Sequence, residues 1–280
     1  MLSNVNTFVP QMVENKSDYF EKIEAKEDLL LLPDDITQDL LGIVNAVERR
    51  VGIHKFLFQG APGTGKTEAV KQLARILDRD IYMINFSSII DSKLGQTQKN
   101  LVEMFEEING FSRPDKLIVL FDEIDAIALD RTSSNDHREM GRATSTLLKC
   151  FDRVNENIVI VATTNLYQYF DKALLRRFDS IIDFDRYTDE DLIEVAEKIL
   201  DKYLNKLKLG NRDIRLFRKI MKLSKEKLYP GDLKNVIRTS VAFSDIDDGM
   251  DYFRRLYDTV CGEKPTDLKK LQEQGFTIRE

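Results

Sequence analysis

The sequence predicts an α/β fold, with helices on both faces of a parallel sheet, followed by a small all-helical region. Short apolar runs alternate with amphipathic stretches over roughly the first two thirds of the chain, which is the pattern of repeated β-α-β units. After about residue 188 only amphipathic helical patterns follow. The run LIVLF at 117–121 is apolar throughout, as expected for a strand covered on both faces.

Five segments are expected to be strands and four to be helices of the α/β part. The helix over 34–50 follows Pro33 and begins with two aspartates, which suit the positive N-terminus of a helix. The expected strands are 56–58, 81–86, 117–121, 158–162 and 180–184, and the other expected helices are 68–77, 99–108 and 143–151. We therefore expect an N-terminal arm over 1–30, mobile or forming a short helix, an α/β subdomain over 31–187 and a helical subdomain over 188–280.

Composition narrows the class of protein. The 280 residues include 42 basic and 48 acidic side chains, so the formal net charge is −6. This balance favours a soluble globular protein and disfavours a general electrostatic affinity for nucleic acid or anionic membrane. The chain has no apolar run long enough to span a membrane and no secretory signal pattern. Two cysteines, Cys150 and Cys261, cannot build a disulfide framework, so a cytoplasmic location is expected.

A glycine-rich segment after the first expected strand has the pattern of a phosphate-binding loop. It reads GAPGTGKT and matches G-x-x-x-x-G-K-[ST]. Glycines let backbone N–H groups converge on phosphate oxygens, and the next helix presents its positive end to the same anion. Lys66 is expected to reach the β- and γ-phosphates of ATP, and the Thr67 hydroxyl to bind Mg²⁺. The nucleotide-binding residues expected here are Gly60, Ala61, Pro62, Gly63, Thr64, Gly65, Lys66, Thr67 and Glu68.

Two adjacent carboxylates, Asp122 and Glu123, directly follow the strand 117–121. Ligands of parallel sheets bind at the carboxyl ends of the strands. Asp122 is therefore expected to bind the nucleotide and its Mg²⁺ opposite Thr67, and Glu123 to act as the catalytic base that polarises the attacking water. The structural alternative is an ordinary helix cap, and the phosphate loop upstream makes it a minor one.

These motifs resemble those of the AAA+ ATPase superfamily, and the similarity is greatest to the AAA clade that includes membrane-remodelling and microtubule-severing ATPases. Residues 60–67 resemble its Walker A motif and residues 117–125 its Walker B motif. The segment VATTN at 161–165 resembles sensor 1, which implies that Asn165 positions the attacking water; a turn-forming asparagine is the alternative. The order of the motifs makes the resemblance specific over about residues 30–185.

The resemblance also implies an assembly. The segment ALLRRFD at 173–179 is similar to the second region of homology, which implies that Arg176 and Arg177 act on the nucleotide of a neighbouring subunit in a ring or spiral, usually a hexamer. A surface cluster of ion pairs is the alternative. Lys234 in GDLK resembles sensor 2 and would touch the γ-phosphate, and a solvated lysine is an equal alternative.

Three features depart from the family pattern. The loop 89–97 carries Lys93 and Leu94 where relatives usually have an aromatic residue that grips polypeptide, which puts threading in doubt. About 30 residues precede the expected core, so substrate choice is expected to rest on this arm, the loops, the lid or a partner. The stretch 201–227 has ten basic and three acidic residues, favouring a solvated helix face over docking of an acidic protein or nucleic acid.

The function expected from all of these features is ATP hydrolysis that drives protein remodelling or unfolding, or that regulates a partner protein. The partner could be a separate protease, since the chain has neither HExxH nor a Ser/His/Asp signature of its own. A nucleic-acid-associated loader or switch is the alternative, favoured by the basic stretch and disfavoured by the acidic total. A nucleotide-gated interaction protein with little turnover is a third hypothesis, against which Glu123 argues.

Overall fold

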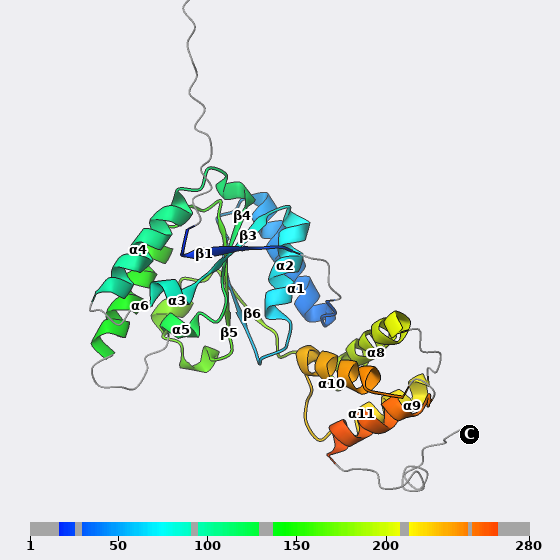
Figure 1. Ribbon diagram of the computed structural model, residues 1–280. Coiled ribbons are helices and arrows are strands. Elements are labelled where there is room, and N and C mark those ends of the chain that lie inside the picture. The colour runs from blue at the N-terminus through cyan, green and yellow to red at the C-terminus, as the bar shows by residue number, and fades with distance from the viewer. Residues whose placement is uncertain are drawn as a thin grey trace, which may run out of the picture.

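The structure, a computed structural model, describes residues 17–25, 30–90, 95–128, 137–207, 213–245 and 248–262. A mostly parallel six-stranded sheet has helices on both faces and is followed by a helical region, α8–α11, as Figure 1 shows. The predicted fold class is therefore confirmed. No helix among the described residues is long and apolar enough to cross a membrane.

The strands are β1 (Phe20–Ile23), β2 (Lys55–Gln59), β3 (Asp80–Ile84), β4 (Leu117–Phe121), β5 (Val159–Thr164) and β6 (Ser180–Asp183). The helices of the α/β part are α1 (Asp34–Arg49), α2 (Lys66–Leu77), α3 (Phe86–Ile89), α4 (Gln96–Asn109), α5 (Asp125–Ala128), α6 (His137–Phe151) and α7 (Lys172–Leu175). Two short 3-10 turns lie at Pro114–Lys116 and Tyr167–Tyr169. The helical region consists of α8 (Asp189–Leu207), α9 (Ile214–Lys222), α10 (Pro230–Ala242) and α11 (Asp251–Cys261).

The strand order in the sheet is β1-β3-β4-β5-β2-β6. All neighbours pair in parallel except β1, which runs antiparallel to β3. In the parallel pairs, Gln59 lies opposite Thr164 and Phe121 lies opposite Ala162. The carboxyl ends of β2, β4 and β5 are therefore level, and the residues that follow them meet at one edge of the sheet.

Residues 20–23 correct the expectation of a mobile arm or short helix, because they form the edge strand β1. Tertiary contacts explain why: the ring of Phe20 packs edge-on against Phe111, with 6.0 Å between ring centroids. Close by, the Tyr19 hydroxyl donates a hydrogen bond to Glu103 at 2.9 Å. A short edge strand with such distant partners leaves only a weak periodic signal in the sequence.

The alternation of side chains along each strand divides the core in two. Phe56 and Phe58 of β2 pack with α1 and α2 on one face, whereas Leu57 packs with α4 and α6 on the other. Figure 1 shows these two pairs of helices on opposite faces of the sheet. The amphipathic stretches predicted as helices therefore cover the sheet with their apolar faces.

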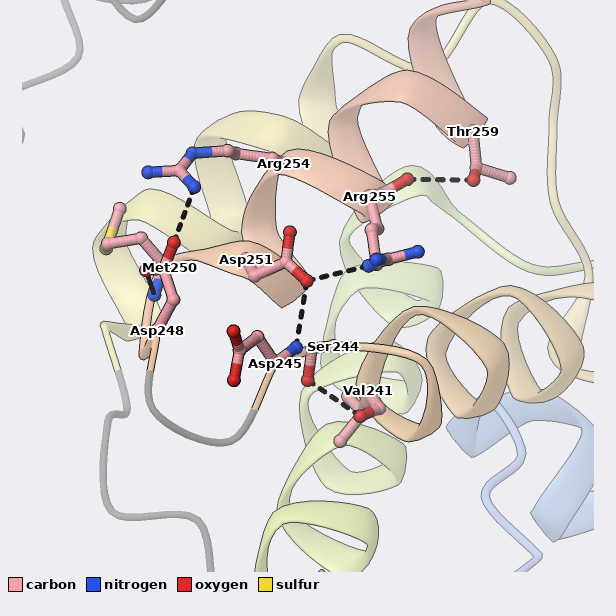
Figure 2. Close-up of polar contacts among 9 residues, drawn as sticks. All are labelled: Val241, Ser244, Asp245, Asp248, Met250, Asp251, Arg254, Arg255 and Thr259. Carbon is pink, nitrogen blue, oxygen red and sulfur yellow. Dashed lines mark hydrogen bonds and ion pairs between the residues drawn. The ribbon is translucent and has the colours of Figure 1, made fainter.

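Carboxylates organise the connection between α10 and α11, which Figure 2 shows. Asp248 accepts hydrogen bonds from the backbone N–H of Met250 at 2.9 Å and from the Arg254 guanidinium at 2.6 Å. Asp251, the first residue of α11, accepts a hydrogen bond from Arg255 at 2.8 Å. The Met250 N–H and then Arg254 hold the pKa of Asp248 below its usual value, and Arg255 does so for Asp251. These charges order the start of α11.

The helical region touches the phosphate loop directly. The N–H of Gly231 in α10 donates to the carbonyl oxygen of Gly63 at 2.8 Å. The hydroxyl of Tyr187, two residues before α8, donates to the carbonyl oxygen of Thr64 at 2.9 Å. The ring of Tyr187 also packs edge-on against Tyr229, with 6.1 Å between centroids. Because the phosphate loop and the start of α10 are in direct contact, a shift of the loop would also move the start of the helix.

Gly42→Ala is expected to raise the free energy of unfolding by about 0.5–1 kcal/mol, because alanine loses less backbone entropy in a helix interior. Gly42 lies inside α1, and an added Cβ would meet no atom within 4 Å. Denaturant titration followed by circular dichroism measures the change. A loss of stability would show that this exposed face of α1 is packed against something.

Gly231→Ala is expected to have the opposite effect and to lower the free energy of unfolding by about 1–3 kcal/mol. An added Cβ at Gly231 would lie 2.8 Å from the Cα of Gly63, so one of the two backbones must move. The same titration measures this variant, and Gly42→Ala is the control, since the chemical change is the same and both glycines lie in helices. Equal gains in both variants would contradict the close packing of α10 on the phosphate loop.

Candidate functional site

A cleft of about 330 Å³ lies between the carboxyl ends of β2, β4 and β5 and the helical region. This volume is within the range of small-molecule sites. Ten residues predicted from the sequence line it: Pro62, Gly63, Gly65, Lys66, Thr67, Glu68, Asp122, Glu123, Asn165 and Lys234. The structure thus brings together residues that lie as far apart in the sequence as Pro62 and Lys234.

Lys66, the first residue of α2, is 8% exposed. Its ammonium donates hydrogen bonds to the carbonyl oxygens of Gly60 at 2.6 Å and Ala61 at 2.9 Å, and to Asn165 Oδ1 at 2.6 Å. Burial lowers the pKa of Lys66, and the carboxylates around it, led by Asp185, act in the opposite direction. A partly desolvated cation held by neutral oxygens is well suited to attract an anion into the cleft.

The carboxylate of Asp122 joins the phosphate loop to the end of β5. Thr67 donates its hydroxyl proton to Asp122 Oδ1 at 3.0 Å, and Thr163 donates to the same oxygen at 2.7 Å. A hydroxyl and a carboxylate side by side are oxygen ligands of the kind that Mg²⁺ accepts when phosphate and water complete its shell. The described residues include no group of three or more His, Cys, Asp or Glu side chains that could hold a metal ion. The donor set at Thr67 and Asp122 fits Mg²⁺ as a companion of a phosphate ligand.

Glu123, which lines the cleft, has a strained backbone. Its φ is 54°, and the other non-glycine residues described with positive φ, Arg50 and Asp78, are C-caps of helices. The Glu123 N–H donates to the Thr163 hydroxyl at 2.9 Å, and the N–H of Ile124 donates to the Thr163 carbonyl at 3.0 Å. Left-handed conformations of such residues are costly and collect at functional sites. The fold therefore keeps the backbone of Glu123 strained, and the Glu123 side chain lines the cleft.

The remaining predicted loop residues, Gly60, Ala61 and Thr64, lie behind the lining of the cleft and shape the loop. The Thr64 hydroxyl donates to the Ala61 carbonyl at 2.9 Å. The N–H of Ala61 donates to Asp185 Oδ1 at 2.7 Å. The φ of Gly60 is 144°, which favours glycine, and a Cβ there would also come within 3.1 Å of Phe184. Sequence reasoning missed Asp185, whose only signal is its position just after β6.

Sequence reasoning also missed an apolar wall of the cleft. The wall and its rim are contributed by the segment before α1 and by α8, and the residues are Leu30, Leu31, Val195, Ile199, Lys202 and Tyr203. Val195 and Ile199 are buried residues of α8, in the region where the sequence predicts amphipathic helices. The period of a helix shows which side chains share a face, but not whether that face meets a core or a ligand.

The two arginines predicted to act on a neighbouring nucleotide do not line this cleft. Arg177 forms a two-point ion pair with Asp152, with both N–O distances at 3.1 Å, and Arg176 is exposed. The structure thus separates them from the other predicted catalytic residues, Glu123 and Asn165. Action on a neighbouring copy stays a prediction.

Other predictions fall partly outside the described residues. Lys93 and Leu94 lie outside them, as do Lys208 and Arg212 of the basic stretch. Within the described part of that stretch, Arg218 pairs with Glu190 at 2.6 Å and with Glu197. Lys227 donates to the Tyr187 carbonyl at 2.7 Å. At least these two basic side chains serve the packing of the helical region.

Comparison with known proteins identifies relatives of the chain. Residues 56–186 match the family model described as "ATPase family associated with various cellular activities (AAA)". An uncharacterised AAA family ATPase of Sinorhizobium fredii is 33% identical over 62% of this chain and 54% of its own length. A proteasome-activating nucleotidase 2 of Halobacterium salinarum is 34% identical over 57% of this chain and 38% of its own length. The chain thus spans about half or less of the length of these curated relatives.

Solved structures agree with the fold. An Escherichia coli Trip13, solved in a HORMA:CdnC:Trip13 complex, matches with a TM-score of 0.65 and 18% identity over 89% of this chain and 96% of its own. The AAA domain of FIGL-1, solved with ADP, matches with a TM-score of 0.61 and 17% identity over 93% and 92%. The family match covers β2 to β6, the strands that carry the phosphate loop and the acidic strand end. Residues 56–186 are therefore similar to the ATPase domain of the AAA family.

Proposed function

We propose that this protein binds ATP in the cleft with Mg²⁺, hydrolyses it to ADP and phosphate, and uses the resulting conformational change to remodel or regulate another protein. The observation that carries the proposal is the meeting of Lys66, the Thr67–Asp122 pair and Glu123 at one edge of the sheet. These groups supply a cation that binds phosphate, oxygen ligands for a metal ion, and a base that accepts a proton from water. Phosphoryl transfer to water requires all three.

Each side chain of the cleft has a separate task in this proposal. The Lys66 ammonium and the backbone N–H groups of the loop bind the β- and γ-phosphates. Thr67 and Asp122 hold Mg²⁺, which neutralises phosphate charge when bound. Glu123 accepts the proton of the attacking water, and Asn165, whose amide oxygen is fixed by Lys66, orients that water. The apolar wall gives the flat face of adenine a dry surface.

We propose that residues 188–280 act as a lid that responds to the nucleotide. Lys234 of α10 and Lys202 of α8 line the cleft, so both can respond to phosphate charge. Gly231 hydrogen-bonds to the phosphate loop at 2.8 Å, which gives the lid a direct mechanical contact with the binding site. Filling and emptying the cleft would thereby change the position of the helical region.

We further propose that the chain works as a homo-oligomer, a hexameric ring or spiral, in which Arg176 and Arg177 serve the nucleotide of the next copy. Two facts support this: both arginines lie outside the cleft of their own chain, and Arg176 is exposed. A guanidinium that enters from a neighbour would neutralise charge on the transferring phosphoryl group.

A protein substrate or partner is favoured by the relatives. They include a proteasome-activating nucleotidase and a putative 26S proteasome regulatory subunit homolog of Methanothermobacter thermautotrophicus, 32% identical over 55% of this chain and 40% of its own length. Regulation of a separate protease in the cytoplasm is one form that this function could take. Nucleic acid is the less favoured partner, because Arg218 and Lys227 of the basic stretch are held by neighbours within the chain.

Lys66→Ala is expected to abolish ATP binding, since it removes the only cation buried under the phosphate site among the described lining residues. Glu123→Gln is expected to keep ATP binding and to lower turnover by about 100-fold or more, because the base is lost and the fold is kept. Phosphate release and ATP affinity measure both effects. Glu48→Gln, on the exposed face of α1, is the control. Normal turnover by Glu123→Gln would refute the assigned base.

ATP turnover is expected to rise when an unfolded polypeptide is added and to stay unchanged with single- or double-stranded DNA. Phosphate release measured at equal mass concentration of each polymer tests this difference. Glu123→Gln with ATP is also expected to retain the polypeptide in a pull-down, and Lys66→Ala is not. Stimulation by DNA alone would overturn the choice of partner and favour a nucleic-acid loader.

A further inference from the structure

The peptide bond between Thr64 and Gly65 has a protein partner on one side only. Its carbonyl oxygen, on Thr64, accepts the hydroxyl of Tyr187 at 2.9 Å. Its N–H, on Gly65, donates to no other residue that the structure describes. Thr64 and Tyr187 are buried and do not line the cleft, whereas Gly65 does. The carbonyl is therefore bound behind the phosphate loop, and the N–H is left for a partner in the cleft.

The direction of this N–H follows from the bond that its carbonyl makes. A trans peptide bond is planar, so its C=O and its N–H point in opposite directions. A hydrogen bond that holds the Thr64 oxygen toward Tyr187 thus directs the Gly65 N–H away from Tyr187. The local backbone suits an anion there: Gly63 and Gly65 have φ of 77° and 99°, and Thr64 between them is not among the residues with positive φ. Such alternation makes a nest of N–H groups.

Glycine by itself does not fix the direction of this peptide bond. A glycine tolerates both signs of φ, so the peptide before Gly65 could rotate by half a turn without a steric penalty at that residue. The Thr64 oxygen would then lie on the cleft side in place of the N–H, and it would repel a phosphate. The rotation would also leave the buried Tyr187 hydroxyl without its acceptor, which is unfavourable. The hydroxyl therefore selects the direction that binds an anion.

Tyr187 is well held for this task. It is 3% exposed, its ring packs edge-on against Tyr229, and its own carbonyl oxygen accepts a hydrogen bond from Lys227 at 2.7 Å. Burial raises the pKa of Tyr187, so the hydroxyl keeps its proton at neutral pH. The carbonyl oxygen of Leu31 lies at 3.4 Å from the same hydroxyl. Thr64 is the nearer acceptor and takes the single proton.

We propose that Tyr187 is a positioning residue of the phosphate loop, whose hydroxyl turns the Thr64–Gly65 peptide so that the Gly65 N–H meets a phosphate oxygen of the nucleotide. The inference rests on the proposed function, ATP binding in the cleft. It assigns nucleotide affinity to a side chain outside the cleft, in the connection between β6 and α8. If the hydroxyl only anchored this connection, its removal would not distinguish ligands with phosphate from ligands without it.

Nucleotide binding by the full chain tests this distinction. In Tyr187→Phe, which keeps the ring, the Kd for ADP is expected to rise about 10-fold or more and the Kd for adenosine to stay within about twofold, since only ADP carries phosphate. Tyr252→Phe is the control, because it removes the hydroxyl of another buried tyrosine, in α11 and outside the cleft. It is expected to leave both Kd values unchanged. Equal losses for the two ligands in Tyr187→Phe, or no loss for either, would overturn the inference.

One labelled peptide bond reports the same group directly. Thr64–Gly65 is the only Thr-Gly pair in the sequence, so threonine labelled at its carbonyl carbon and glycine labelled at nitrogen give one correlated magnetic resonance signal. ADP and inorganic pyrophosphate are expected to shift the Gly65 nitrogen resonance of the unchanged chain, and adenosine is not. In Tyr187→Phe the Thr64 carbonyl resonance is expected to move before any ligand is added. A Gly65 resonance that ADP leaves in place would overturn the inference, even if Tyr187→Phe does not fold.

Steady-state kinetics separate this role from a role in the chemical step. Tyr187→Phe is expected to raise KM for ATP about 10-fold and to keep kcat within about threefold, because the contact binds ground state and transition state alike. A fall in kcat with an unchanged KM would overturn the inference. If the unchanged chain binds neither ATP nor ADP, the proposed function itself fails. If it binds and hydrolyses ATP while Tyr187→Phe keeps normal affinity for ADP, only the role of Tyr187 fails.

Discussion

The parallel pairing of β2, β5 and β4 is the constraint on which the candidate site depends. The pairing sets Gln59 opposite Thr164 and Phe121 opposite Ala162, so all three strands end at one edge. The phosphate loop, the acidic strand end and Asn165 follow directly from these ends. Two short contacts then join them: Lys66 to Asn165 at 2.6 Å and Thr67 to Asp122 at 3.0 Å. A slip of one residue in either pairing would separate these groups and turn the strand faces over.

The second organising feature is the contact between the phosphate loop and the helical region. Gly63 and Gly231 approach so closely that a Cβ at Gly231 would lie 2.8 Å from the Cα of Gly63. Tyr187 adds a hydrogen bond from the connection before α8 to Thr64 of the same loop. Because the contact between Gly231 and Gly63 joins two backbones, it transmits displacement without passing through a flexible side chain. The cleft thus has one wall at the edge of the sheet and the other on the helical region.

A second rigid arrangement lies outside the cleft, around Arg177. A buried pair of rings, Phe151 and Phe178, fixes two chain segments, and the adjacent residues Asp152 and Arg177 form the ion pair. Rigid packing below an exposed charge is how a protein gives direction to a side chain that would otherwise sample many rotamers. The glycine contact and the ion pair both set geometry more than they add stability.

The sequence by itself determined the class of fold, the approximate positions of five strands and four helices, and the composition of the phosphate loop and the acidic strand end. These features are local: the period of apolar residues, glycine at turns and the order of a motif such as GAPGTGKT are visible in short windows. Only the tertiary structure decided that residues 20–23 pair as β1, that Leu30 and Val195 face the cleft, and that Asp152 holds Arg177. Each of these depends on residues that are distant in the sequence. The local pattern of apolar residues does not show which distant residues will come into contact.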